Sequence, residues 1–95
     1  MVNLAQAKVL VVDWLRGREE TLGYSLRILD EQVEEHEWGW VIWFGPDDPS
    51  QVPPDQRDRV HLPYIVDRIT GRVRPVGTYG INLSVAKLLQ ERQES

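Results

Sequence analysis

The sequence contains no cysteine, and its 95 residues include only two histidines, His36 and His61. Without cysteine the chain has no disulfide framework, no thiolate nucleophile, no cysteine-ligated zinc site and no iron–sulfur cluster. The first thirteen residues are rich in apolar side chains, but polar residues interrupt them and no basic segment precedes the apolar part. They match neither a signal peptide nor a membrane span, so we expect a cytoplasmic protein with no membrane partner.

A chain of 95 residues with 41% hydrophobic residues and four tryptophans is expected to form one domain, residues 1–95, around one core. Its net charge of −4 is unevenly divided, because residues 1–56 carry a net charge of −7 and residues 57–95 a net charge of +3. This division predicts an acidic and a basic zone on the folded surface, each suited to attract a partner of opposite charge.

The N-terminal segment has the pattern of an amphipathic helix. Asn3 and Gln6 have the spacing of a capping box, which predicts that the helix begins there, and we expect Gly17 to end it. The apolar residues of its predicted buried face recur at intervals of three or four: Leu4, Ala7, Leu10, Val11, Trp14 and Leu15.

Two strands are expected in the middle of the chain. Residues 24–28 alternate between apolar and polar side chains, as in a strand with one buried face. Leu29 breaks the alternation, which indicates a bulge or a strand end, and the acidic stretch that follows should be exposed. Residues 40–44 are aromatic or β-branched, which is typical of a central strand. Four prolines within residues 45–56 then predict an exposed, extended loop, either a binding loop or a tolerated surface insertion.

The C-terminal part predicts a hairpin and a helix. Residues 62–66 and 72–76 are the expected strands, joined by a glycine-containing turn and therefore antiparallel. After a turn at residues 77–80, Asn82 or Ser84 is expected to cap a helix, and residues 90–95 should fray. The order is helix, four strands, helix. It predicts an α+β fold in which both terminal helices pack on one face of a four-stranded antiparallel sheet.

No segment carries a recognisable catalytic or metal-binding pattern. His36 and His61 have no evident partner, and the serines lack the glycines of a nucleophile elbow. Strand alternation would send the acids of residues 30–37 to opposite faces, which disfavours a metal site. The glycines of residues 77–80 lack the lysine of a phosphate-binding loop. We therefore expect no enzymatic activity, no catalytic residue, no cofactor and no metal ion.

The tryptophans leave binding as the main expectation. Trp40 lies in the most apolar run and should belong to the core, so alternation turns Trp43 toward the other face of the sheet. A tryptophan left partly exposed there would mark an interface. Arginines beside tryptophans also suggest single-stranded nucleic acid. However, their spacing does not group them with an exposed tryptophan and the chain is acidic overall, so no nucleic-acid partner is expected.

Four segments resemble the immunity protein 35 family, also called the YrhB-type domain: residues 26–31, 38–44, 63–73 and 76–78. The most specific features of the resemblance are residues of expected turns and strands that form a structural motif: Gly39, Trp40, Pro63, Asp67, Gly71, Gly77 and Thr78. The resemblance covers nearly the whole chain. It departs from the family at residues 60–61, where a Gly-Asn pair is common, and in the proline-rich loop. It implies a small α+β bacterial protein that is encoded beside a toxin and neutralises it by binding.

Under this resemblance, tight binding would rest on aromatic anchors with acids aiding the encounter. Trp38 and Trp43 are the expected anchors, and the proline-rich loop with Asp47 and Asp48 is an expected contact arm. The expected steering acids are Asp30, Glu34, Glu35 and Glu37. The alternative is a small chaperone-like or scaffold domain that binds partially folded proteins through exposed aromatics. The oligomeric state and the identity of the toxin stay open.

Overall fold

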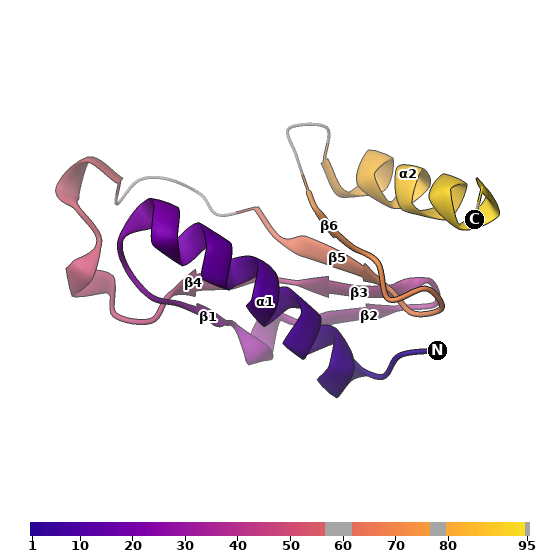
Figure 1. Cartoon of the computed structure of the whole chain (residues 1–95), viewed down its shortest axis with the longest axis horizontal. Coiled ribbons are helices and arrows are strands. Elements are labelled where there is room, and N and C mark those ends of the chain that lie inside the picture. Colours follow the sequence, from indigo (N-terminus) through magenta and orange to yellow (C-terminus); the bar gives the residue numbers. More distant parts are fainter. Residues whose placement is uncertain (57–61, 77–79, 95) are drawn as a thin grey trace.

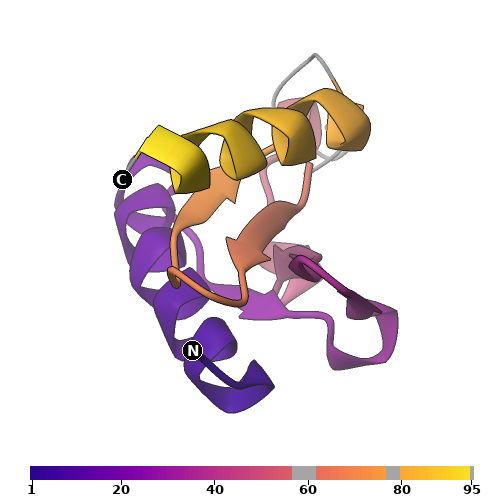
Figure 2. The same ribbon diagram turned by 90° about the vertical axis from the view of Figure 1, so that its right-hand side faces the viewer.

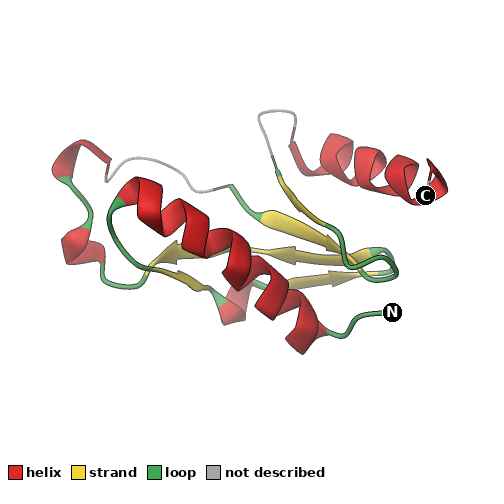
Figure 3. Cartoon of the chain, in the orientation of Figure 1, coloured by secondary structure: helices red, strands yellow, loops and turns green. Residues whose placement is uncertain are grey.

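The computed structural model describes residues 1–56, 62–76 and 80–94. It has an α+β fold with a helix near each end of the chain, which confirms the expected fold class and the order of its parts (Figures 1 and 3). The helices and strands are α1 (Leu4–Leu22), β1 (Leu26–Ile28), β2 (Glu34–His36), β3 (Gly39–Ile42), β4 (Phe44–Pro46), β5 (Tyr64–Asp67), β6 (Val73–Pro75) and α2 (Gly80–Glu94).

The first helix begins as predicted and ends later. The Asn3 side chain accepts a hydrogen bond from the Gln6 backbone N–H at 2.9 Å, and the Gln6 side chain accepts one from the Asn3 N–H at 2.9 Å, so the capping box is complete. The expected end at Gly17 is wrong, because α1 continues to Leu22. One glycine inside a helix costs about 1 kcal/mol, which the rest of α1 outweighs. Gly23 ends the helix in the left-handed conformation at φ +84°.

The strands form two antiparallel sheets, one of order β1-β4 and one of order β2-β3-β5-β6. The predicted strand at residues 40–44 is therefore split between β3 and β4. The predicted strand at residues 24–28 is β1 of the two-stranded sheet, and β2 forms within the acidic stretch that follows it. Leu29 still donates its N–H to the Trp43 carbonyl at 2.9 Å, but pairing resumes only at Glu34 opposite Val41. A 3-10 turn at Asp30–Gln32 takes up the extra residues. In Figure 1, β1 and β2 follow one another along one line, and β4 and β3 run beside them along a second line. The two sheets together therefore look like one interrupted ribbon.

The proline-rich segment is less extended than predicted. Its start, Phe44–Pro46, pairs with β1 as strand β4, and two 3-10 turns follow at Pro49–Gln51 and Pro54–Gln56. Val52 between these turns is buried, whereas most of its neighbours are exposed, so the segment is anchored to the molecule at this point.

The hairpin β5–β6 has the predicted antiparallel pairing, with Val66 opposite Val73 and Tyr64 opposite Pro75. Its turn is built around Asp67, whose carboxylate accepts hydrogen bonds from the N–H groups of Ile69 and Thr70 at 2.7 and 3.0 Å. Local hydrogen bonding of this kind is the reason that aspartate favours turns.

The two helices lie on opposite faces of the four-stranded sheet, so the expectation that both pack on one face is wrong. Alternate residues of β3 contribute to two separate core clusters. The α1 cluster consists of Ala7, Val11, Leu15, Trp40, Ile42, Phe44, Tyr64 and Val66. The α2 cluster consists of Val41, Ile65, Val76 and Leu88. Figure 2 shows the sheet between α1 and α2.

Helix α2 differs in detail from its prediction. It begins at Gly80, and Ser84 lies inside it with its hydroxyl donating to the Gly80 carbonyl at 2.9 Å. Leu88 is its buried contact, whereas Leu83 is 54% exposed. The helix continues to Glu94, so the expected fraying from residue 90 is wrong over the described part of the tail. Within the described residues, neither helix combines the length and the apolar character that crossing a membrane requires.

Candidate functional site

The strongest candidate for a functional site is a half-buried aromatic surface beside the edge strand β2. It consists of Glu34, His36, Trp38 and Trp43, and we call it the β2 surface. Glu34 lies opposite Val41, so its side chain shares the sheet face on which α2 packs. The Trp43 indole Nε1–H donates a hydrogen bond to Glu34 Oε2 at 3.2 Å, which brings one predicted anchor and one predicted acid together.

His36 and Trp38 complete this surface. Their rings are stacked, with centroids 5.1 Å apart and an angle of 7° between the planes. Trp38 and Trp43 both pack at the margin of the α2 cluster, and both remain partly exposed. His36 was not among the predicted contact residues, although its position two residues before Trp38 in a β segment was a usable signal.

The β2 surface stays open because of where α2 lies. The main contacts of α2 are with β5 and β6, while β2 is the opposite edge strand of the sheet. The helix therefore covers one half of this sheet face and leaves the tryptophans of the other half partly in solvent. Tryptophans that are half buried on a folded framework are well suited as anchors, since their rings are already oriented.

The other predicted acids do not join the β2 surface. Glu35 lies opposite Trp40 on the α1 face, 3.7 Å from the guanidinium of Arg68. That guanidinium also lies over the Trp40 ring, 5.0 Å from its centroid, and Trp40 is buried as predicted. Asp30 pairs with Lys8 at 2.8 Å. Two of the four expected steering acids are thus paired with lysine or arginine, and a third, Glu34, lies 3.6 Å from His36 Nε2.

The remaining predicted contact residues are separated from one another. Glu37 is exposed in the turn between β2 and β3. Asp47 and Asp48 follow β4, at the other end of the interrupted ribbon (Figure 1). The Asp48 carboxylate accepts hydrogen bonds from the Ser50 hydroxyl at 2.7 Å and the Ser50 N–H at 3.0 Å, and these bonds lower the pKa of Asp48. Asp48 thus caps a 3-10 turn and is oriented toward its own loop.

The structural motif is most informative at Gly39 and Asp67. Gly39 has φ +155°, and a β-carbon there would collide with the Val66 carbonyl, so the position requires glycine. Pro63 is buried, and its carbonyl accepts a hydrogen bond from Val76 at 2.9 Å. The Gly71 N–H donates to the Asp67 carbonyl at 2.9 Å and closes the hairpin turn. Gly77 and Thr78 lie outside the described residues.

Asp67 also ties the hairpin to α2, a connection that the sequence analysis missed. Arg92 donates from Nε to Asp67 Oδ2 at 3.0 Å and from Nη2 to Oδ1 at 2.8 Å. Burial by itself raises the pKa of Asp67, but the Arg92 hydrogen bond together with the Thr70 and Ile69 amides outweighs it, so the pKa is lowered. The carboxylate is thus held as an anion and fixes the last part of α2 on the sheet.

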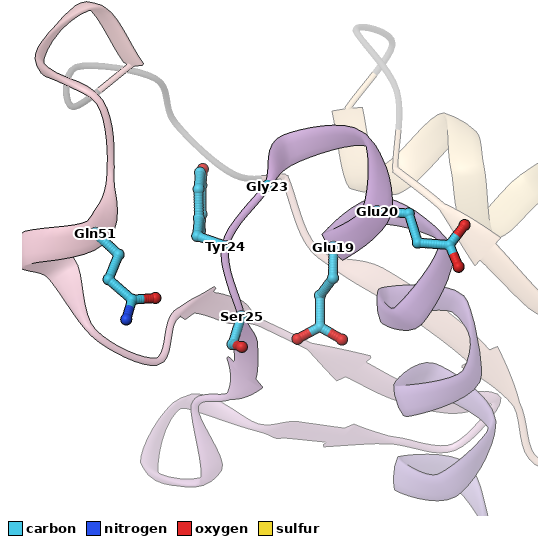
Figure 4. A pocket seen from close by; sticks show the side chains of 6 residues that line it. All are labelled: Glu19, Glu20, Gly23, Tyr24, Ser25 and Gln51. Atoms are coloured by element: carbon cyan, nitrogen blue, oxygen red, sulfur yellow. The ribbon is translucent and has the colours of Figure 1, made fainter.

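A hollow lies between the end of α1 and the proline-rich segment, with a volume of about 360 Å³. Its lining residues are Glu19, Glu20, Gly23, Tyr24, Ser25 and Gln51. Figure 4 shows the carboxyl groups of Glu19 and Glu20 pointing in different directions. Glu19 accepts a hydrogen bond from the Leu26 N–H at 2.7 Å, so its carboxylate stabilises the connection between α1 and β1. Within the described part of the chain, no three histidine or acidic side chains form a group that could hold a metal ion.

Comparisons with protein-family models, with curated proteins and with solved structures find no match to this chain.

Proposed function

We propose that this chain is an immunity protein of the immunity protein 35 type, which neutralises a bacterial toxin by forming a stoichiometric complex. The proposal assigns it no catalytic step. It acts in the bacterial cytoplasm. Its gene lies beside the gene of the polymorphic toxin that it inhibits. An inhibitor of this kind needs only a surface that covers the working site of its target.

The observation that carries the proposal is the β2 surface. Trp38 and Trp43 are partly exposed, yet His36, Glu34 and the α2 cluster hold their rings in place. Interfaces draw most of their binding energy from a few such aromatic anchors, because little side-chain entropy is lost when they dock. Glu34 and Glu37 beside them favour a target with basic groups at its working site, and charge of this kind mainly speeds association.

The test is co-expression of the chain with the C-terminal domain of the secreted protein encoded beside it. Growth should be rescued, and the two proteins should form a one-to-one complex in native mass spectrometry. The double variant Trp38→Ala/Trp43→Ala should lose both rescue and complex, whereas Trp14→Ala, a partly exposed tryptophan on α1, should retain them.

Rescue by the double variant at wild-type level would contradict the role of the β2 surface. A chain that forms no complex with the neighbouring domain, but delays aggregation of several unfolded proteins at once, would instead support the chaperone-like alternative.

A further inference from the structure

The other edge of the four-stranded sheet carries a depression that the proposed function does not use. Its volume is about 410 Å³, within the range of binding pockets. We call this region the β6 edge. It is lined by Trp14 of α1, by Arg72, Val73, Arg74 and Pro75 in and just before β6, and by Glu91 of α2.

The two sides of the β6 edge differ in chemistry because strand residues alternate between faces. Val73 packs with the α1 cluster and Pro75 lies opposite Tyr64, a member of that cluster, so this side is apolar. Trp14 extends it: the indole is 5.8 Å from the Tyr64 ring, and the residue is 47% exposed. Trp14, Val73 and Pro75 thus form one contiguous apolar lining of the depression, and contiguous exposed apolar surface is typical of a contact site.

The other side is basic. Arg74 lies opposite Ile65, on the α2 face, and both Arg72 and Arg74 pair with Glu91. The Arg72 Nη1 atom is 3.1 Å from Glu91 Oε2, and Arg74 bonds the other carboxylate oxygen. One carboxylate thus faces two guanidinium groups whose side chains are 46% and 44% exposed. One positive charge remains in excess, and both groups can donate further hydrogen bonds.

The backbone of β6 also has free bonding capacity. Asp67 donates its N–H to the Arg72 carbonyl and Val76 donates to the Pro63 carbonyl, both at 2.9 Å. Because antiparallel ladders alternate, residues 72, 74 and 76 point their backbone groups toward β5. Val73 therefore directs its N–H and C=O outward, as Pro75 does its C=O. Within the described residues, no strand pairs with this outer side of β6.

We propose that the β6 edge binds an extended acidic peptide segment of a partner protein, which adds to the sheet beside β6. Its apolar side chains contact Trp14, Val73 and Pro75, and the acidic side chains that alternate with them contact Arg72 and Arg74. Strand addition of this kind takes its affinity from main-chain hydrogen bonds and its selectivity from alternate side chains.

A peptide fits this place better than a nucleic acid. Half of the lining is apolar and has no counterpart in a phosphate backbone, and the chain as a whole carries a net charge of −4. The site is separate from the β2 surface, since β2 and β6 are opposite edges of the sheet. The proposed toxin inhibition and this peptide site can therefore fail independently.

The test uses the full chain and a short fluorescein-labelled peptide in which glutamate and valine alternate, with binding followed by fluorescence anisotropy. The double variant Arg72→Glu/Arg74→Glu should weaken binding about tenfold, because two attractive contacts become repulsive. The matched control is Arg27→Glu, an exposed arginine of β1 outside the depression, and it should bind as the wild type does. If the double variant does not fold, Trp14→Ala replaces it with the same expected direction.

Hydrogen exchange at the Val73 amide tests the strand addition itself, and exchange should slow when the peptide is bound. Several results would each overturn the proposal. These are no binding of the acidic peptide, equal binding of a lysine–valine peptide, undiminished binding by the folded variant, or unchanged exchange at Val73. Tighter binding of a single-stranded oligothymidylate than of the peptide would overturn it as well.

Discussion

Strands β2 and β6 are both short edge strands of one sheet, yet they present opposite surfaces. At β2, Glu34 and Glu37 accompany two half-buried tryptophans on the half of the face that α2 leaves partly in solvent. At β6, two arginines and Trp14 frame a depression between the two helices. Both edges avoid uncontrolled strand pairing, β2 through its acids and β6 through Pro75 and its flanking side chains.

The difference comes from the position of one helix. The hydrogen bonds from Arg92 to buried Asp67 help to hold α2 over β5 and β6. The helix therefore covers the sheet beside β6, while the sheet beside β2 stays partly exposed. The Arg92–Asp67 pair, together with the Glu91 pairs to Arg72 and Arg74 and the packing of Leu88, holds α2 over one half of the sheet face and leaves the other half exposed.

The largest effect is expected from Asp67→Ala, which removes the carboxylate that the Arg92 guanidinium bonds at two points. Removing one member of a largely buried ion pair should lower the free energy of unfolding by about 3 kcal/mol. Urea unfolding followed by tryptophan fluorescence measures it. The control Asp47→Ala, at an exposed position, should change the value by less than about 0.5 kcal/mol. Equal losses in the two variants would show that the pair does not hold α2.

Acid should remove the same contribution. Because folding lowers the pKa of Asp67, its stabilising effect is complete above the ordinary value of 3.8 and is lost as the pH falls through the lower pKa of the folded state. Unfolding free energies between about pH 5 and pH 2 should therefore fall less steeply for Asp67→Asn than for the wild type. The variant Asp47→Asn, at an exposed position, serves as control and should keep the wild-type slope. Parallel curves for the wild type and Asp67→Asn would exclude Asp67 as the source.

A crossed pair of tryptophan variants tests whether the two edges bind independently. Trp43→Ala should weaken toxin-domain binding about tenfold or more and leave acidic-peptide binding unchanged, since an interfacial anchor is lost at one edge only. Trp14→Ala should do the reverse. Isothermal titration of both ligands with both variants measures the four affinities. If either variant weakens the binding of both ligands equally, the edges form one site or the variant has perturbed the fold.

The smallest effect is expected at Gly17, an exposed position inside α1 where the β-carbon of an alanine would meet no atom within 4 Å. Gly17→Ala should raise the free energy of unfolding by about 0.5–1 kcal/mol, because alanine loses less backbone freedom on folding. Thermal unfolding checks this. Both binding activities should stay as in the wild type, and lower stability would contradict the continuous helix.

Local features of the fold were predictable from the sequence. The capping box joins residues three apart and the hairpin turn joins its own flanking strands, so short patterns contain the needed information. The end of α1 was not predictable from Gly17 alone, because a helix tolerates one glycine where the rest of its turn is favourable.

Side-chain alternation alone did not predict that the helices pack on opposite faces of the sheet. Residues 39–42 and 64–67 are buried throughout, and near-continuous apolar runs are typical of strands covered on both faces. The candidate site was predictable in part: Trp43 and Glu34 do meet, whereas the break between β1 and β2 sends Asp30 and Glu35 elsewhere. The Arg92–Asp67 pair joins residues 25 apart on different elements, beyond any local pattern.

The same pair has a consequence for the order of events during synthesis. Asp67 leaves the ribosome 25 residues ahead of Arg92. The hairpin turn is therefore synthesised before the arginine that pairs with its carboxylate. Until then, water must solvate the carboxylate, because burial of an unpaired charge is costly. The local hydrogen bonds of the Asp67 turn can form early, but the ion pair that holds α2 on the hairpin forms only after Arg92 has been translated.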